Sequence, residues 1–429
     1  MQAIILNGGY GTRLGLTSKP KPMVKLYGKT LLEHSIENLK LSGIEDIIFL
    51  NGFMSEKIES YYGDGKKFGV KILHYSEIEP MGTSGAILNI QDHLQDSFLV
   101  IYGDLLFNFD FAKLIAFGNN HHGIGSIVVH PNNHPHDSDL VSFDENFKID
   151  RIFNKPHKKK LLVRNNVSSA IYFLKKEILK YIPKNTSSDW MRDVFPNALG
   201  KIYAYRSSEF IFDVGTKKRI SMARKFITSK NFLMGSYANK RKAIFLDRDG
   251  VINKEINGVY NHNNLEIIPQ SDKAIKAINN SEYLAICITN QSGIAKGFLS
   301  FDDLNLIHAK LDSLLADSRA YLDDLYFCPH HPESGFEGEI KQYKIPCNCR
   351  KPMPGMLEDA AIKHNIDIKN SYFISDTLKD LEISKKIKVH TVLVSTGHGK
   401  EQYSMSNMGH SKEKNLFQAV QNILSTDKD

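Results

Sequence analysis

The chain has 429 residues, of which 41% are hydrophobic and 24% charged, and 55 basic against 48 acidic residues give a net charge of +7. This length exceeds what one hydrophobic core usually supports, so we expect two or three domains. The composition excludes a disordered chain, a collagen-like chain and a small disulfide framework. The longest apolar runs are strand-sized, which argues against a membrane-spanning protein.

The first half of the chain alternates short apolar segments with amphipathic ones. Four segments rich in β-branched and aromatic residues are predicted to be buried strands. They are 3–6, 46–50, 70–74 and 97–102. Helical spacing of apolar residues predicts helices around 31–39 and 58–62. This alternation favours a mostly parallel sheet covered by helices.

A second alternation begins near residue 241. A basic amphipathic helix is predicted after Thr216, and turn residues without periodicity follow over 226–240, which we interpret as a linker. The strands expected beyond it are 243–246, 284–288, 325–327, 372–374 and 391–394, with helices near 271–280, 302–316 and 354–364. The sequence thus predicts an α/β protein with two Rossmann-like domains in tandem, 1–225 and 241–429.

A glycine-rich turn follows the first predicted strand, with the sequence Gly8-Gly9-Tyr10-Gly11-Thr12-Arg13. Glycines there let backbone N–H groups approach phosphate oxygens, and an arginine adds positive charge. Taken alone, the turn is also compatible with a purely structural role. It is not a Walker loop, because no Gly-Lys-Ser/Thr ends it, and its spacing does not match a dinucleotide-binding fingerprint.

Further motifs follow this turn in order along the first domain. They are Lys19-Pro20-Lys21-Pro22-Met23, the segment 79–86, Tyr102-Gly103-Asp104, Asn154-Lys155-Pro156 and the segment 212–216. Together they make residues 1–225 resemble the sugar-1-phosphate nucleotidyltransferase family.

The resemblance implies a role for each motif. Arg13 and Lys21 would hold the triphosphate while pyrophosphate leaves, Asp104 and Asp213 would hold Mg²⁺, and Lys155 would bind the sugar phosphate. The other substrate-binding residues implied are Gly8, Gly9, Gly11, Thr12, Gly82, Thr83 and Gly85, the last three facing the base. Taken singly, Asp104 also fits a strand-end turn residue and Lys155 a solvated lysine.

Three departures from the family pattern bear on the sugar more than on the reaction. Asn7 stands where the family has a small residue, and Asn154 stands where a glutamate precedes Lys-Pro. Ser168-Ser169-Ala170 replaces the Asn-Ala-Gly of the sugar-binding strand.

Two carboxylates, Asp247 and Asp249, follow the predicted strand 243–246. Past the C-terminal end of a strand both can point into one crevice, where one attacks phosphorus and the other moves a proton. Thr289-Asn290-Gln291, Arg350-Lys351-Pro352 and Ser375-Asp376 come later in the chain. This order resembles the haloacid dehalogenase phosphatases over about 241–425.

The second resemblance makes Asp247 the nucleophile and Asp249 the general acid/base. A Mg²⁺ ion would be held by Asp247, the Asp249 carbonyl and Asp376. Residues implied to bind the phosphoryl group or the rest of the substrate are Thr289, Asn290, Arg350 and Lys351.

Three of the four cysteines crowd into one region together with a histidine. Cys328 with His330, and Cys347 with Cys349, form two close pairs of ligands, which fit tetrahedral structural Zn²⁺. The arrangement resembles the zinc loop of the heptose-bisphosphate and histidinol-phosphate phosphatase branch. Arg350 adjoins the cluster, so the loop is expected to read the far phosphate of the substrate.

Both resemblances together predict a bifunctional enzyme of carbohydrate metabolism. The phosphatase would remove the 7-phosphate of D-glycero-D-manno-heptose 1,7-bisphosphate, and the transferase would join the heptose 1-phosphate to a nucleotide, with GTP as expected donor, for polysaccharide biosynthesis. One alternative is a cytidylyltransferase and phosphatase acting on another sugar or polyol phosphate. Others are histidinol phosphate as the phosphatase substrate and a non-catalytic regulatory first domain.

The expected partners are small molecules, namely NTPs and sugar phosphates, with Mg²⁺ and Zn²⁺ as cofactors. No long Lys/Arg tract supports nucleic-acid binding. The N-terminus lacks a signal-peptide pattern, and clustered cysteines suit a reducing compartment, so a cytoplasmic location without a membrane partner is expected. The sequence leaves formation of a homo-oligomer open.

Overall fold

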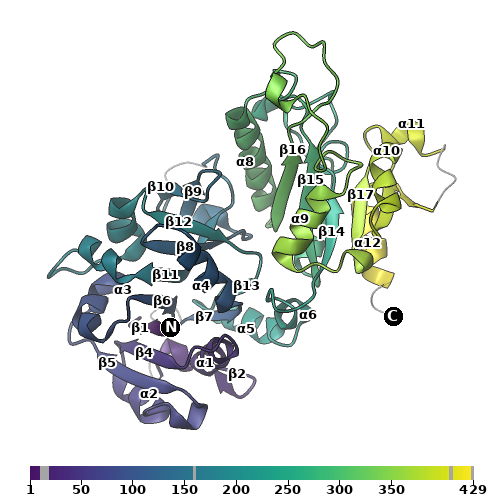
Figure 1. Cartoon of the computed structure of the whole chain (residues 1–429). Helices are drawn as coiled ribbons and strands as arrows, with labels where there is room; N and C mark the ends of the chain where they lie inside the picture. The colour runs from purple at the N-terminus through teal and green to yellow at the C-terminus, as the bar shows by residue number, and fades with distance from the viewer. Residues whose placement is uncertain (10–18, 158–160, 405–408, 427–429) are drawn as a thin grey trace. The chain divides into compact units, whose positions relative to one another are not determined.

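The computed structural model describes residues 1–9, 19–157, 161–404 and 409–426, and they form two compact units (Figure 1). The first unit comprises Met1–His130, Asp137–His157 and Asn166–Ser236, and the second comprises Pro131–His136, Lys158–Asn165 and Tyr237–Asp429. Each is an α/β unit, which confirms the predicted fold class. Among the described residues, no helix has the length and apolar character needed to cross a membrane.

The first unit is built on a nine-stranded mixed sheet. Its parallel part has the order β6 (Ser97–Tyr102), β1 (Gln2–Asn7), β4 (Asp46–Asn51) and β5 (Lys71–Ser76), which are the four strands predicted from the sequence. β11 (Val167–Lys175) pairs antiparallel with β6. The sheet is completed by β8 (Gly125–His130), β9 (Leu140–Phe143), β10 (Ile149–Phe153) and β12 (Ile202–Arg206).

Helices cover both faces of this sheet and thereby bury β1 on both sides. Ala3 and Ile5 pack in a core with α1 (Leu31–Leu41), α2 (Ser55–Tyr62) and α4 (Phe111–Asn120). Ile4 faces the other side, where η4 (Ala86–His93) and η7 (Trp190–Val194) lie. α1 begins at Thr30, whose hydroxyl accepts from the Glu33 amide while the Glu33 carboxylate accepts from the Thr30 amide, a capping box.

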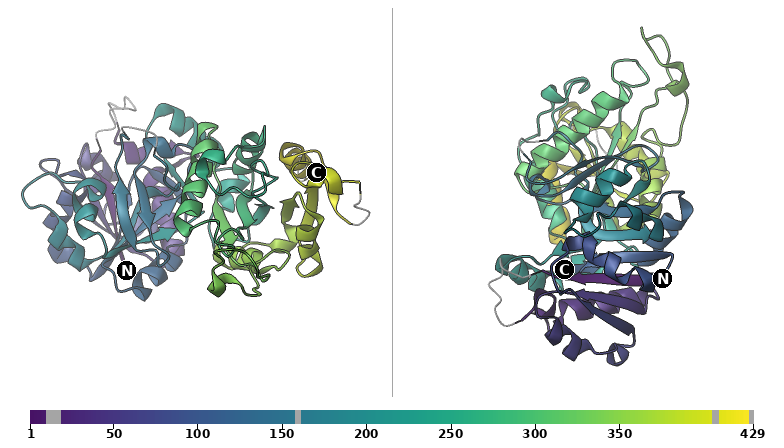
Figure 2. Two further views of the ribbon diagram at one scale, coloured as in Figure 1. Left: turned by 90° about the horizontal axis from the view of Figure 1, so that it is seen from above. Right: turned by 90° about the vertical axis from the view of Figure 1, so that its left-hand side faces the viewer.

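The second unit contains a six-stranded parallel sheet, and Figure 2 gives two further views of the chain. The strand order is β16 (Asp324–Cys328), β15 (Tyr283–Asn290), β14 (Lys242–Leu246), β17 (Tyr372–Ser375), β18 (His390–Val394) and β19 (Ser411–Glu413). The sequence predicts the first five of these strands. β19 has three polar residues, none of them fully buried, so it carries no buried-strand pattern.

Alternate residues of β14 enter two different cores. Ile244 and Leu246 pack with α7 (Ser271–Asn279), α8 (Phe301–Asp317) and α12 (Leu416–Thr426). Ala243 and Phe245 pack with α9 (Gly355–His364) and α10 (Leu378–Leu381). A strand buried on both faces shows no hydrophobic alternation, which explains its continuous apolar sequence.

The remaining short elements connect these layers. The segment 226–240, predicted as a linker without periodicity, contains the one-turn helix α6 (Lys230–Leu233), which begins where the Ser229 hydroxyl accepts from the Phe232 amide. The other elements are η2 (Lys21–Met23), β2 (Lys25–Leu26), β3 (Lys29–Thr30), η3 (Lys66–Phe68), α3 (Gly82–Gly85), β7 (Leu105–Asn108), η5 (Pro135–Asp137), η6 (Lys176–Tyr181), η8 (Phe195–Ala198), β13 (Phe210–Asp213), α5 (Lys217–Phe226), η9 (His262–Asn264), η10 (Lys341–Tyr343), η11 (Ile368–Asn370), η12 (Glu382–Lys385) and α11 (Gly399–Gln402).

β11 carries an irregularity at one of the departures from the family pattern. Its register against β8 shifts between Ser168 and Tyr172. Ala170 lies within this stretch and has φ of 61°, a left-handed conformation that is costly for a residue with a Cβ. The strand therefore keeps the backbone shape that a glycine would adopt without strain.

Replacing Ala170 by glycine is expected to stabilise the first unit by about 1 kcal/mol, because glycine adopts positive φ without steric cost. The matched control is Ala204→Gly in β12, which should destabilise the unit by a similar ~1 kcal/mol, because it only removes a side chain and adds chain entropy. Urea unfolding followed by tryptophan fluorescence tests both, since the single tryptophan, Trp190, is buried in the first unit. If Ala170→Gly destabilised the unit instead, the claim that the backbone at Ala170 is strained would be wrong.

Candidate active sites

The carboxyl ends of the parallel strands in the first unit gather the predicted nucleotide-binding residues at one edge of the sheet. β1 ends at Asn7 and leads into Gly8 and Gly9. The Cα of Gly8 lies against another strand end, because a Cβ on Gly8 would be 2.8 Å from Glu77 Oε2. Gly9 has open space around the position of a Cβ. Gly11, Thr12 and Arg13 lie outside the described residues.

The structure brings Lys21, Asp104 and Asp213 together. Lys21 Nζ forms an ion pair with Asp104 Oδ2, and the Val214 amide donates to the Asp104 carbonyl oxygen over 2.9 Å, which places Asp213 beside it. Burial, and next the charge of Asp104, raise the pKa of Asp213. Arg219 Nη1 lies 2.7 Å from Asp213 Oδ2 and opposes this shift. Two crowded carboxylates are a donor set that suits Mg²⁺.

Lys155 lies near this acidic pair without forming a close contact with it. Its Nζ is 3.9 Å from Asp139 Oδ2, and its amide donates to Asp139 Oδ1 over 2.9 Å. The charge of Lys155 also acts to lower the pKa of Asp213. The exposed side chain of Lys155 is therefore available to an anion bound near Asp213.

The segment expected to face the base is fixed against residues 186–189. Gly82 has φ of 75°, and a Cβ there would lie 2.3 Å from the Ser188 carbonyl oxygen. Thr83 Oγ1 donates to Asp189 Oδ2 over 2.8 Å. Gly85 is also tightly packed, since its Cβ would lie 3.2 Å from the Thr186 carbonyl oxygen. Both glycines are thus required by close packing, and contact with a base stays a prediction.

Sequence reasoning missed Glu77, which directly follows β5 at the same edge. Its Oε1 accepts from the Met81 amide over 3.0 Å, and its Oε2 lies beside Gly8. Burial raises the pKa of this carboxyl group, against the effect of the Met81 amide. The available signal was an acidic residue just past a predicted strand and ahead of the segment 79–86.

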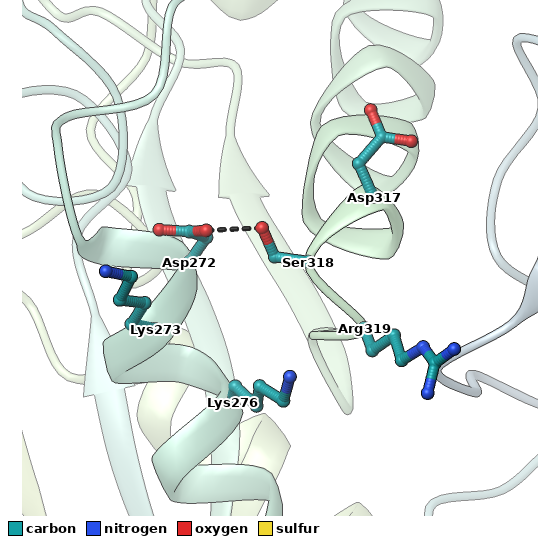
Figure 3. A pocket seen from close by; sticks show the side chains of 6 residues that line it. All are labelled: Asp272, Lys273, Lys276, Asp317, Ser318 and Arg319. Atoms are coloured by element: carbon teal, nitrogen blue, oxygen red, sulfur yellow. Dashed lines mark hydrogen bonds between the residues drawn. The ribbon is translucent and has the colours of Figure 1, made fainter.

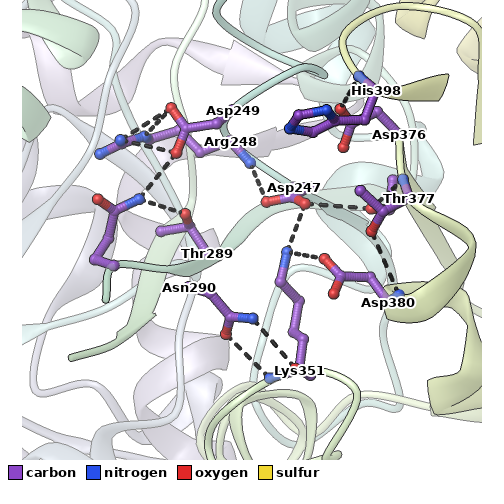
Figure 4. Close-up of polar contacts among 12 residues, drawn as sticks. Asp247, Arg248, Asp249, Thr289, Asn290, Lys351, Asp376, Thr377, Asp380 and His398 are labelled. Carbon is purple, nitrogen blue, oxygen red and sulfur yellow. Dashed lines mark hydrogen bonds and ion pairs between the residues drawn. The ribbon is translucent and has the colours of Figure 1, made fainter. Parts of the chain in front are cut away.

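The second unit collects its predicted catalytic residues in the same way, at the carboxyl ends of β14, β15 and β17 (Figure 4). Lys351 Nζ lies 2.6 Å from Asp247 Oδ2 and 2.8 Å from Asp380 Oδ2. Ser375 Oγ donates to Asp247 Oδ2 over 3.2 Å, and the Arg248 amide donates to Asp247 Oδ1 over 2.7 Å. These donors fix both oxygens of the predicted nucleophile.

Negative charge is crowded around Asp247. Burial, with the charges of Asp380 and Asp376, raises the pKa of Asp247 well above its usual range, while Lys351 opposes the shift. Burial likewise raises the pKa of Asp376 to about 6. Cβ atoms on Gly250 and Gly397 would lie 2.1 and 2.2 Å from Asp376 Oδ2, so two glycines make room for this carboxylate. A divalent cation fits such a group of buried oxygen donors.

Asp249 is held differently from Asp247. Its carboxylate accepts from Arg248 Nη2 at 2.9 and 3.0 Å, from Asn253 Nδ2 at 2.9 Å and from Gln291 Nε2 at 3.0 Å. Burial acts to raise the pKa of Asp249, but these partners, with Arg248 foremost, lower it below its usual value. A general acid needs a pKa closer to the working pH, so the acid/base role requires the carboxyl group to leave Arg248.

Asn290, at the end of β15, holds the backbone of Lys351 in position. Asn290 Oδ1 accepts from the Lys351 amide over 3.0 Å, and Asn290 Nδ2 donates to the Lys351 carbonyl oxygen over 3.2 Å. Thr289 Oγ1 accepts from Gln291 Nε2 over 2.8 Å. Substrate contacts of Thr289, Asn290 and Lys351 stay predictions.

The four predicted metal ligands meet in one cluster. One ligand atom from each of Cys328, His330, Cys347 and Cys349 lies within 4.8 Å of the others, and the sulfur atoms are 3.1 to 3.6 Å apart. Three thiols and one imidazole at such separations fit tetrahedral Zn²⁺. Arg350 Nη1 donates to the His330 carbonyl oxygen over 3.1 Å, so the cluster fixes this arginine.

A pocket of about 380 Å³ lies away from these residues, between α7 and the end of α8 (Figure 3). Ser318 Oγ donates to Asp272 Oδ2 across it. Its lining residues are Asp272, Lys273, Lys276, Asp317, Ser318 and Arg319. None of the predicted site residues lines this pocket.

The two sites define the class of protein: an enzyme that joins a nucleotidyltransferase unit to a phosphatase unit. A family model described as nucleotidyl transferase matches residues 2–230, and one described as HAD-hydrolase-like matches residues 348–413. The chain belongs to the nucleotidyl transferase family through its first unit and to the heptose-bisphosphate phosphatases through its second.

Two relatives, one for each unit, support the assignments, and one solved structure is also similar to the second unit. The D-glycero-beta-D-manno-heptose-1,7-bisphosphate 7-phosphatase of Pasteurella multocida is 41% identical over 158 residues, 37% of this chain and 83% of that protein. The mannose-1-phosphate guanylyltransferase catalytic subunit beta of Dictyostelium discoideum is 33% identical over 264 residues, 59% of this chain and 70% of that protein. A crystal structure of D,D-heptose 1,7-bisphosphate phosphatase from B. bronchiseptica with magnesium and phosphate is 30% identical, covers 43% of this chain and 99% of that chain, and has a TM-score of 0.39.

Replacing a cluster cysteine is expected to remove bound metal and to destabilise the second unit, because three ligands hold Zn²⁺ far less tightly than four. Cys347→Ala should lose about one equivalent of zinc per chain, measured by elemental analysis, and should unfold at lower temperature. The control is Cys287→Ala, which changes a buried cysteine of β15 outside the cluster. Equal zinc content in both variants would contradict the ligand assignment.

Proposed function

We propose that this chain dephosphorylates D-glycero-D-manno-heptose 1,7-bisphosphate at C7 and transfers a nucleotidyl group, GMP from GTP, to the resulting heptose 1-phosphate. In this proposal residues 1–225 form the nucleotidyltransferase domain, residues 226–240 are the linker, and residues 241–429 form the phosphatase domain. One observation carries the proposal: a single chain contains two acidic sites at strand ends, one in each unit. The relative of the second unit is named a heptose-bisphosphate phosphatase, and the relative of the first unit is named a mannose-1-phosphate guanylyltransferase.

In the phosphatase step an oxygen of Asp247, which Lys351 and bound Mg²⁺ would keep ionised despite its burial, attacks the phosphorus at C7, and the bond from phosphorus to the sugar oxygen breaks. Lys351, 2.6 Å from Asp247, neutralises charge on the transferring group. Asp249, once released from Arg248, protonates the leaving oxygen and then takes a proton from the water that hydrolyses the aspartyl phosphate. Mg²⁺ held by Asp247, the Asp249 carbonyl and Asp376 would supply further positive charge.

In the transfer step an oxygen of the sugar 1-phosphate attacks the α-phosphorus of the nucleotide, and pyrophosphate leaves. Two anions must approach each other, so cations are needed at the site. Lys21 and Arg13 hold the triphosphate, and Lys155 holds the sugar phosphate. Mg²⁺ held by Asp104 and Asp213 would reduce the repulsion between the two phosphates.

Glu77 favours guanine as the base. Its carboxylate lies between Gly8 and the segment 79–86, which is expected to face the base. Guanine presents two adjacent donors, N1–H and the 2-amino group, and a carboxylate accepts both. Uracil presents one N–H between two carbonyl acceptors, which repel a carboxylate, and cytosine presents a single amino donor.

Structural zinc at the four-ligand cluster of the second unit would hold Arg350 in position to bind the remote phosphate of the phosphatase substrate.

The two activities are expected to respond to separate substitutions. Asp247→Asn should lower phosphate release from the bisphosphate by roughly 10³-fold or more, because the nucleophile is lost. Asp104→Asn should instead lower pyrophosphate release from GTP and heptose 1-phosphate by roughly 10²-fold. Each variant serves as the control for the other. Wild-type enzyme that releases phosphate but never pyrophosphate with any NTP would overturn the transferase half of the proposal.

Glu77→Gln is expected to lower kcat/KM for GTP by roughly 10- to 100-fold, because an amide donor replaces one of the two acceptors facing guanine. Inosine triphosphate lacks the 2-amino group, so the wild-type preference for GTP over ITP should shrink in Glu77→Gln. The control is Glu56→Gln, the same change at an exposed residue of α2 outside the predicted motifs. An unchanged GTP/ITP ratio in Glu77→Gln would show that another residue reads the base.

A further inference from the structure

A row of aromatic side chains lies at the surface of the second unit without a role in the reaction described above. Tyr260 and Phe298 are 39% and 50% exposed. Their ring centroids are 5.7 Å apart, and Phe298 is 6.3 Å from the ring of Phe336, both edge-to-face. Three loops far apart in sequence thus present one continuous aromatic surface, which we call the aromatic rim.

The aromatic rim borders the predicted acid/base. The ring of Tyr260 packs against Gly293, because a Cβ on Gly293 would lie 2.7 Å from Tyr260 Cε1. Gly293 follows Gln291, whose amide donates to the carboxylate of Asp249. After burial and Glu255, the charge of Asp249 contributes to the raised pKa of Tyr260. The rim therefore lies close to Asp249, the residue proposed to protonate the leaving group of the phosphatase reaction.

Two lysines give the rim positive charge. Lys296 Nζ and Lys344 Nζ lie 4.6 and 4.7 Å from the centre of the Phe336 ring. The Lys344 side chain is only 6% exposed, and its Nζ has no hydrogen-bond partner among the described residues. Its ion-pair partner, Glu339 Oε2, is 3.5 Å away. A buried ammonium group short of hydrogen bonds is costly, and a bound phosphate oxygen would supply them.

We propose that the exposed rings of the aromatic rim, Tyr260 and Phe298, bind the sugar ring of the phosphatase substrate, while Lys296 and Lys344, which lie over the ring of Phe336, bind its remote phosphate. The faces of aromatic rings carry partial negative charge and attract the C–H groups of a pyranose, and they also bury its apolar face. This inference rests on the proposed function, since it takes a phosphorylated sugar as the leaving group.

A single exposed ring tests the rim. Phe298→Ala removes the middle of the row, while Phe298→Tyr keeps a ring of the same shape. The control is Phe301→Ala, which removes another exposed phenylalanine, 43% exposed, whose ring contacts Tyr343 and Phe327 instead. The quantity compared is kcat/KM for heptose 1,7-bisphosphate divided by kcat/KM for acetyl phosphate, which has no sugar ring.

Phe298→Ala should lower this ratio by about tenfold, the size expected for one stacking contact, through a higher KM. Phe298→Tyr should restore the ratio, and Phe301→Ala should leave it at the wild-type value. An unchanged ratio in Phe298→Ala would overturn the inference. If the sedimentation coefficient of that variant also shifted, the rim would instead be a contact between two copies of the chain.

Failure of the proposed function gives a different result. If the wild-type protein hydrolyses another sugar phosphate, such as fructose 1,6-bisphosphate, but not the heptose, the heptose assignment fails, and the same ratio with that sugar decides the role of the rim. If the wild-type protein hydrolyses acetyl phosphate and no sugar phosphate, both the proposed function and the rim fail.

Discussion

Both sites depend on one electrostatic arrangement, an ion pair between a lysine and an aspartate at the end of a parallel strand. Lys21 pairs with Asp104 after β6, and Lys351 pairs with Asp247 after β14. Parallel strands end at a common edge, so their last residues converge, and acidic side chains brought together there repel each other. The lysine offsets this repulsion in the folded chain and, in the proposed mechanism, presents positive charge to the entering phosphate. We propose that the same contact in each unit serves both the packing of the acidic residues and the phosphate chemistry.

The sequence predicted the parts of the fold and sites that depend on local patterns. Nine strands are where short apolar segments predicted them, and Asp104, Asp247 and Asp376 follow their strands as expected. The prediction that the first four of them are buried was wrong for β5, which lies at the edge of its sheet and buries only Ile72. The four metal ligands were also predictable, because their residue types and spacing carry the signal. Such features require no knowledge of which distant segments meet.

Other features were not predictable because they arise from contacts between distant segments. Asn290 clamps the backbone of Lys351, 61 residues away, and Gln291 and Asp249, which form a hydrogen bond, are 42 residues apart. The lowered pKa of Asp249 follows from such contacts and from its neighbour Arg248. The contact of the Glu77 carboxylate with Gly8 belongs to the same group, since only the folded sheet brings the two together, although an acidic residue just past a predicted strand was a local signal.

The two proposed reactions are chemically ordered. Hydrolysis at C7 leaves the phosphate at C1 intact, and that phosphate is the nucleophile that nucleotidyl transfer requires. Phosphorus NMR of the wild-type protein with heptose 1,7-bisphosphate, GTP and Mg²⁺ follows every species in one sample. We predict that inorganic phosphate and heptose 1-phosphate appear first, followed by pyrophosphate and a GDP-sugar in equal amounts. A nucleotide sugar that still carries the 7-phosphate, or heptose 1-phosphate that accumulates without pyrophosphate, would contradict the account.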